Sequence, residues 1–136
     1  MADDVLINKA AAIERAVRRV REEHAGDDAS LTVNQARQDS IILNLQRACE
    51  RSIDAAMHVV RVHGLGVPQE PREAFELLRQ ARIIDSALAD RLKKMVDFRN
   101  IAVHDYQRLS LDIVRQIIAR HLDDFLEFRR VLLSAR

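Results

Sequence analysis

The stretch QDSIILNLQRACERSIDAAMHVV, residues 38–60, decides the fold class of this chain. Its apolar residues recur at intervals of three and four, which is the period of a helix face and not of a strand. A second apolar row lies beside the first, so the stripe is wider than a surface helix needs and predicts burial on more than one side. The rows are Ile42, Leu45, Cys49, Ile53, Ala56 and Val60, and Ile41, Ala48, Ala55, Val59 and Val62. We therefore expect a long helix over about residues 34–63.

All glycines and prolines lie in two segments, HAGDDASLTVN (24–34) and HGLGVPQEP (63–71), which we interpret as breaks between helices. The same periodicity predicts further helices over about residues 4–24, from Pro71 to about Arg82, from Asp85 or Ser86 as N-cap, and after Ser110 as N-cap. The predicted fold is all-α, an antiparallel bundle of four long helices and one short helix, in a single domain over residues 1–136.

The last predicted helix carries a regular apolar stripe that includes a histidine. Its members are Leu111, Val114, Ile118, His121, Phe125, Phe128 and Leu132. Because no second metal ligand stands at suitable spacing, we interpret His121 as a packed or interface residue.

Composition narrows the class of protein. The chain is 48% hydrophobic and 32% charged, and no apolar run approaches the roughly 20 residues of a membrane span. The start carries acids where a signal peptide carries positive charge, so we expect a cytoplasmic protein without a membrane partner. The one cysteine, Cys49, lies in an apolar helical stretch and is interpreted as a buried thiol.

Net charge and aromatic content limit how the chain can bind nucleic acid. The formal net charge is only +1, so any such contact must come from a local patch. Aromatic residues make up 4% of the chain, which leaves little for base stacking. RLKKM (91–95) could form a basic rim for RNA or for a protein partner, although a solvated face is the simpler interpretation.

Known catalytic templates do not match the sequence. There is no HExxH, CxxC, GxSxG or glycine-rich phosphate loop, so we expect neither a metal site nor a bound cofactor. Glu50, Asp54 and His58 follow one another at intervals of four, which could orient a histidine but is better explained as a solvated charge row. The roles of Asp39 and Asn44 stay open.

The segment RNIAVHDY, residues 99–106, departs from regular helix packing. Arg99 stands where the stripe of its helix requires a core residue, and burying an unpaired cation is costly. His104 lies five residues later, which is ~140° around a regular helix. The two side chains can converge only if the helix breaks between them or if two copies of the segment face each other. A structural arginine beside a helix-end histidine is the alternative.

This residue set suits cleavage of RNA without a metal. Arginine binds a phosphate diester through its fork of N–H donors, and histidine can transfer a proton near pH 7. RNA supplies its own nucleophile, the 2′-hydroxyl.

Arg99, four residues, His104, one residue and Tyr106 resemble the RX4HXY motif of the HepT toxins, a branch of the HEPN superfamily of helical ribonucleases. The resemblance extends over nearly the whole chain, through residues 38–60, GLGVPQEPREAFELLRQARIID (64–85) and KKMVDFRNIAVHDY (93–106).

The resemblance implies a HEPN-like homodimer whose two motifs form one metal-independent ribonuclease site. Arg99 would stabilise the scissile phosphate, His104 would act as general acid or base, and Asn100 would position the substrate. The expected product carries a 2′,3′-cyclic phosphate. A minimal nucleotidyltransferase antitoxin, MntA-like, would silence the toxin by adding AMP to Tyr106, and the two proteins could form a higher assembly.

Two functions therefore stay open at this point. The first is a toxin ribonuclease of a toxin–antitoxin system that cuts cellular RNA. The alternative is a non-catalytic HEPN dimer that serves as a scaffold or substrate for its nucleotidyltransferase.

Overall fold

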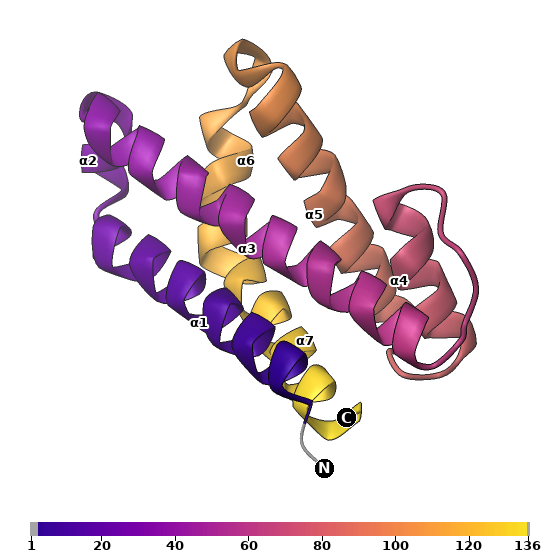
Figure 1. Ribbon diagram of the computed structural model, residues 1–136. Helices are drawn as coiled ribbons and strands as arrows, with labels where there is room; N and C mark the ends of the chain where they lie inside the picture. Colours follow the sequence, from indigo (N-terminus) through magenta and orange to yellow (C-terminus); the bar gives the residue numbers. More distant parts are fainter. Residues whose placement is uncertain (1–2, 136) are drawn as a thin grey trace.

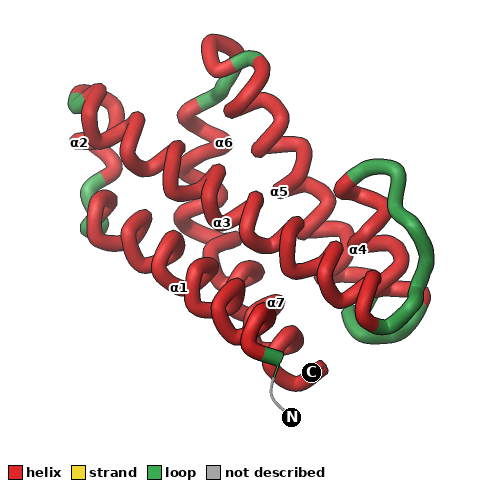
Figure 2. Tube along the Cα trace, viewed as in Figure 1, coloured by secondary structure: helices red, strands yellow, loops and turns green. Residues whose placement is uncertain are grey.

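A computed structural model describes residues 3–135 of the chain. Within that range it is helical and contains no strand, as Figure 2 shows. The α-helices are α1 (Asp4–His24), α2 (Asp28–Val33), α3 (Gln35–Val62), α4 (Pro71–Gln80), α5 (Ser86–His104), α6 (Leu111–Gln116) and α7 (Leu122–Ala135). A 3-10 turn, η1 (Tyr106–Arg108), follows α5, and a π-helical turn, η2 (Ile117–His121), joins α6 to α7. The predicted all-helical bundle is confirmed.

The long helices pack around α3 (Figure 1). On one side α3 packs against α1, and on the other it packs against α5, while α7 contacts all three. The short helix α4 covers one end of α3 and α5 after the longest loop, residues 63–70 (Figure 2). α1 begins and α7 ends at the same end of the bundle.

Short polar side chains start the helices where the sequence predicts. The side chain of Asp3 accepts hydrogen bonds from the backbone amides of Val5 and Leu6 at the start of α1, at 3.0 and 3.2 Å. Asp85 accepts the amide of Leu88 at 2.8 Å, so it is the N-cap of α5. Such caps satisfy amides that have no partner within the helix. Ser110 is the N-cap position of α6, but its side chain makes no capping bond.

The core is continuous, and its members come from every long helix. Its largest fully buried side chains include Leu6, Ile13, Ile41, Leu45, Phe75, Leu78, Leu88, Leu92, Phe125, Phe128 and Leu132. Phe75 on α4 meets Phe128 on α7 edge to face, with ring centroids 5.6 Å apart. Cys49 is buried as predicted, and burial raises the pKa of its thiol far above the usual range. None of the helices in residues 3–135 is long and apolar enough to cross a bilayer.

Two local predictions were wrong. Residues 28–33, interpreted as part of a break, form the helix α2, with the side chain of Asp27 capping the amide of Ser30. The C-terminal stripe is also displaced, because η2 adds a residue to one turn. The structure therefore buries Ile117 and Leu122 in place of Ile118 and His121. The partly exposed His121 lies 3.0 Å from Asp124 through its Nδ1.

Candidate active site

Helix α5 runs without interruption from Ser86 to His104. Arg99 and His104 are therefore both on a regular helix, where five residues correspond to a rotation of ~140°. This excludes a break between them as the way to bring the two side chains together. Within one copy of the chain, the Arg99 side chain lies toward α3 and His104 is exposed.

A glutamate on the neighbouring helix compensates the charge of Arg99. Nη2 of Arg99 donates to Oε2 of Glu50 on α3 at 3.1 Å, and Nη1 of Arg99 donates to Oδ1 of Asn100 at 3.2 Å. The two charged side chains are only 26% and 33% exposed, so water screens their attraction less than on an open surface. The buried Nε of Arg99 has no hydrogen-bond partner among the described residues. Glu50 therefore holds the guanidinium against α3.

The charge row of α3 was interpreted as solvated, and this is wrong for two of its three members. Glu50 is the partner of Arg99, as described above. His58 is buried, with its Nε2 2.8 Å from Oδ2 of Asp3. Asp54 alone is exposed, 3.7 Å from Arg51. No spacing rule predicts a partner that lies on another helix.

His104 and Asn100 share the exposed face of α5. They are four residues apart, which places them one above the other on the helix surface. His104 is the last residue of the helix. His104 therefore lies at the exposed C-terminal end of α5, two residues before Tyr106.

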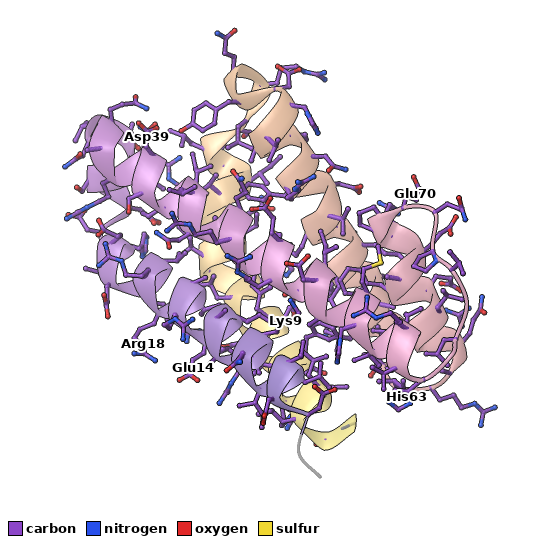
Figure 3. The ribbon with its side chains drawn as sticks, viewed as in Figure 1. Lys9, Glu14, Arg18, Asp39, His63 and Glu70 are labelled. Carbon is purple, nitrogen blue, oxygen red and sulfur yellow. The ribbon has the colours of Figure 1, made fainter. Side chains whose placement is uncertain are left out.

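Tyr106 is held by an aspartate from the start of α3. Its hydroxyl donates to Oδ1 of Asp39 at 2.5 Å, across 67 positions of sequence. The same oxygen accepts Nε2 of Gln35 at 2.9 Å. Figure 3 shows Asp39 near the end of the bundle at which α5 terminates. Burial, and then the bond to Asp39, raise the pKa of Tyr106 to about 12, although the residue is 42% exposed.

Asp39 therefore forms a hydrogen bond with a residue of the segment 99–106, whereas the side chain of Asn44 bonds within α3. Asn44 is buried on α3, and its Nδ2 donates to the carbonyl of Ser40 at 2.8 Å.

The Asp39–Tyr106 bond has a measurable consequence for alkaline titration. We expect the absorbance of Tyr106 to change to that of tyrosinate with a midpoint at about pH 12, and Asp39→Asn to lower that midpoint toward 10. Removing the neighbouring negative charge favours the anion, whereas burial still opposes it. The signal is unambiguous because the chain has one tyrosine and no tryptophan. Circular dichroism verifies the fold at each pH, and exposed Asp90→Asn is the control. A wild-type midpoint near 10 would contradict the bond.

A cavity of about 230 Å³ adjoins Arg99. Its lining consists of Glu50, Arg51, Ile53, Asp54, Pro71 and Arg99. In the part of the chain that the structure describes, no cluster of three or more histidine, cysteine, aspartate or glutamate residues could hold a metal ion. The charged groups that line this cavity are two arginines and two carboxylates, Glu50 and Asp54.

The RLKKM segment supplies little free positive charge. Arg91 pairs with Asp124 at 2.8 Å and Glu127 at 3.2 Å, and Lys93 pairs with Glu76 at 2.7 Å. Of the basic residues in the segment, Lys94 is the exposed one without such a pairing among the described residues.

Arg99 and His104 lie near the end of α5 and Tyr106 follows in η1, within the helical bundle expected for a HEPN ribonuclease. Residues 13–132 match the family described as Ribonuclease HepT-like. The chain is 48% identical over 130 residues to the mRNA nuclease HepT of Shewanella oneidensis. This match covers 96% of this chain and 97% of that protein. The chain belongs to the HepT-like ribonuclease family, so the resemblance noted in the sequence is confirmed.

Solved structures agree with this assignment. A tri-AMPylated Shewanella oneidensis HEPN toxin in complex with an MNT antitoxin is 47% identical, with a TM-score of 0.93, covering 98% of this chain and 99% of that one. A toxin–antitoxin complex with AMP-PNP has the same identity and TM-score, covering 97% and 99%.

Proposed function

We propose that the chain is the toxin of a toxin–antitoxin system, a metal-independent endoribonuclease whose active site forms between two copies. The observation that carries this proposal is the divergence of Arg99 and His104 by ~140° on an unbroken helix. A second copy, related by a two-fold axis, supplies the missing side chain. The similarity to the mRNA nuclease HepT supports cellular RNA as the substrate.

The reaction needs no group beyond those of the dimer and the RNA. His104 accepts the proton of the 2′-hydroxyl, whose oxygen then bonds to the adjacent phosphorus. The bond from phosphorus to the 5′-oxygen breaks, and His104 of the partner subunit protonates that oxygen. The products are a 2′,3′-cyclic phosphate and a 5′-hydroxyl. Arg99 stabilises the charge that develops on the phosphate, and Asn100 positions the strand.

Exposed apolar side chains beside the motif support a dimer contact there. Leu43, Ile101 and Val103 are 42%, 39% and 40% exposed. Leu43 lies one helical turn from Asp39 on α3, and Val103 lies one turn from Arg99 on α5. Apolar area of this kind is stabilised by contact with a self-complementary surface.

We propose further that a nucleotidyltransferase antitoxin, MntA-like, silences the site by AMPylation of Tyr106, within a toxin–antitoxin assembly in the cytoplasm. Tyr106 follows His104 by two residues and is half-exposed. Each added phosphodiester places negative charge beside Arg99 and His104, and each adenosine adds bulk to the cleft. The AMPylated toxin–antitoxin relative supports this modification.

One experiment tests both halves of the proposal. The purified chain is incubated with mRNA in excess EDTA, with and without prior treatment by the antitoxin and ATP. We expect cleavage in EDTA, with 2′,3′-cyclic phosphate ends, and loss of cleavage once intact mass shows added AMP. Tyr106→Phe is expected to cleave but to gain no mass and to resist silencing. AMP on the phenylalanine variant would refute the assignment of Tyr106, and cleavage that requires a metal would refute the mechanism.

A further inference from the structure

A groove between α1 and α3 is lined mostly by arginines and has no part in the reaction described above. Its volume is about 410 Å³. Its lining comprises Arg15 and Arg19 on α1, Arg47 and Arg51 on α3, and Ala12, Ala16 and Asn44. Each helix contributes two arginines four residues apart, so each pair lies on one face. We call these seven residues the basic groove.

The charge of the basic groove is only partly compensated. Arg19 lies 3.5 Å from Glu22 and 3.0 Å from Glu23, and Arg51 lies 3.7 Å from Asp54. Among residues 3–135, no carboxylate forms an ion pair with Arg15 or Arg47, and both side chains are exposed. Like charges gathered in this way attract an anion.

The outer side of α1 is different. Glu14 forms ion pairs with Arg18 at 3.4 Å and with Arg129 on α7 at 3.3 Å. Figure 3 shows Glu14 and Arg18 pointing away from α3. Arg18 therefore has a carboxylate partner, unlike Arg15 and Arg47 in the basic groove.

Small and buried residues give the basic groove its depth. Ala12 and Ala16 come from α1, and Ala16 and Asn44 are only 6% and 5% exposed. The amide of Asn44 is tied to the backbone of α3, so the floor is ordered before any ligand binds.

The basic groove adjoins the cavity beside Arg99. Arg51 lines both the groove and the cavity that contains Glu50 and Arg99. Arginines therefore extend across α3, from Arg15 at the far side of the groove to Arg99. This continuity distinguishes a path for substrate from an isolated basic patch.

We propose that the basic groove binds the phosphodiester backbone of a single RNA strand and leads that strand to Arg99. The inference rests on the nuclease function proposed above. Arginine forks match phosphate oxygens, and the groove contains no aromatic side chain on which a base could stack. Binding should therefore depend on phosphates and not on base sequence. The RLKKM segment, in which Arg91 and Lys93 form ion pairs with carboxylates, is not part of this path.

The test measures binding of a labelled single-stranded RNA of mixed sequence by fluorescence anisotropy at several salt concentrations. All chains carry His104→Ala, so that the RNA stays intact. Arg15→Ala with Arg47→Ala should weaken binding and make the slope of log K against log salt shallower by about 1.4, because each phosphate contact on a single strand contributes about 0.7. Arg15→Lys with Arg47→Lys keeps both charges and should keep most of the slope.

Arg18→Ala with Arg120→Ala is the matched control, since it removes two exposed arginines outside the groove. We expect this pair to keep the parent affinity and slope. In chains that retain His104, the groove variant should raise KM for RNA while kcat stays near that of the wild type, because uniform binding has been removed.

Three results would overturn the proposal. If the slope of log K against log salt falls equally in the groove and control variants, binding depends on total charge and not on the basic groove. If the groove variant binds RNA normally but no longer binds the purified antitoxin, the groove belongs to a protein partner. If the parent chain binds no RNA and the wild type cleaves none, the nuclease function fails together with the inference.

Discussion

Replacing Arg99 or His104 with alanine is expected to reduce RNA cleavage by at least about 10²-fold and to abolish growth arrest on expression. A positioned proton-transfer group contributes roughly 10²–10⁴-fold, and removal of one donor that stabilises developing charge costs about 10²–10³-fold. A homodimer loses both copies of the side chain at once. Cleavage of labelled RNA by purified variants and growth of cells that express them measure these effects.

Two additional variants separate chemistry from folding. Arg99→Ala leaves Glu50 without its partner, so Arg99→Lys, which keeps the charge but loses the fork, should also lose most activity. Lys94→Ala, at an exposed position of the same helix, should cleave like the wild type. If alanine variants with intact helical signal arrest growth as the wild type does, the non-catalytic scaffold is the correct function.

The second large effect concerns which subunit supplies each side chain. A mixed dimer of one Arg99→Ala subunit and one His104→Ala subunit should cleave at least about 10-fold faster than either variant homodimer. It keeps one arginine and one histidine on opposite subunits, and a single positioned histidine retains part of the roughly 10²–10⁴-fold acid–base contribution. Two affinity tags isolate the mixed species before cleavage is measured.

The matched comparison is a dimer of one wild-type subunit and one subunit that carries both alanines. It has the same number of arginine and histidine side chains, but both lie on one subunit, where they diverge by ~140°. We expect this dimer to be the less active of the two mixed species. The reverse order would mean that each subunit cleaves with its own pair, and the composite site would be wrong.

The elements of the fold follow from local signals, which explains why most were predictable. Asp85 ends a turn and caps α5, and Pro71 opens α4, because both act on backbone groups within a few residues. The helix α2 was missed because six residues are too few to establish a period, although an N-cap such as Asp27 was a usable signal. The register after η2 was missed because a π-turn leaves the 3,4 pattern of residue types intact.

Residues of the candidate site divide in the same way. The motif residues are close in sequence, so their spacing alone drew attention to them. Their partners are not: Glu50 is 49 positions from Arg99, and Asp39 is 67 positions from Tyr106. An acid on a helix surface resembles a solvated residue until the packing of two helices determines what it faces. The catalytic roles of Arg99 and His104, the positioning role of Asn100 and the AMPylation of Tyr106 remain predictions.

The uninterrupted course of α5 has a consequence for dose. If cleavage requires two copies, a newly made subunit is inert, and at low abundance the active species increases with the square of chain concentration. Doubling expression then raises activity about fourfold until dimers saturate. A cell would tolerate sporadic transcription of the gene and respond sharply once production exceeds the dimer dissociation constant. Because the unbroken helix α5 makes a single subunit inactive, it would set a threshold concentration for toxicity.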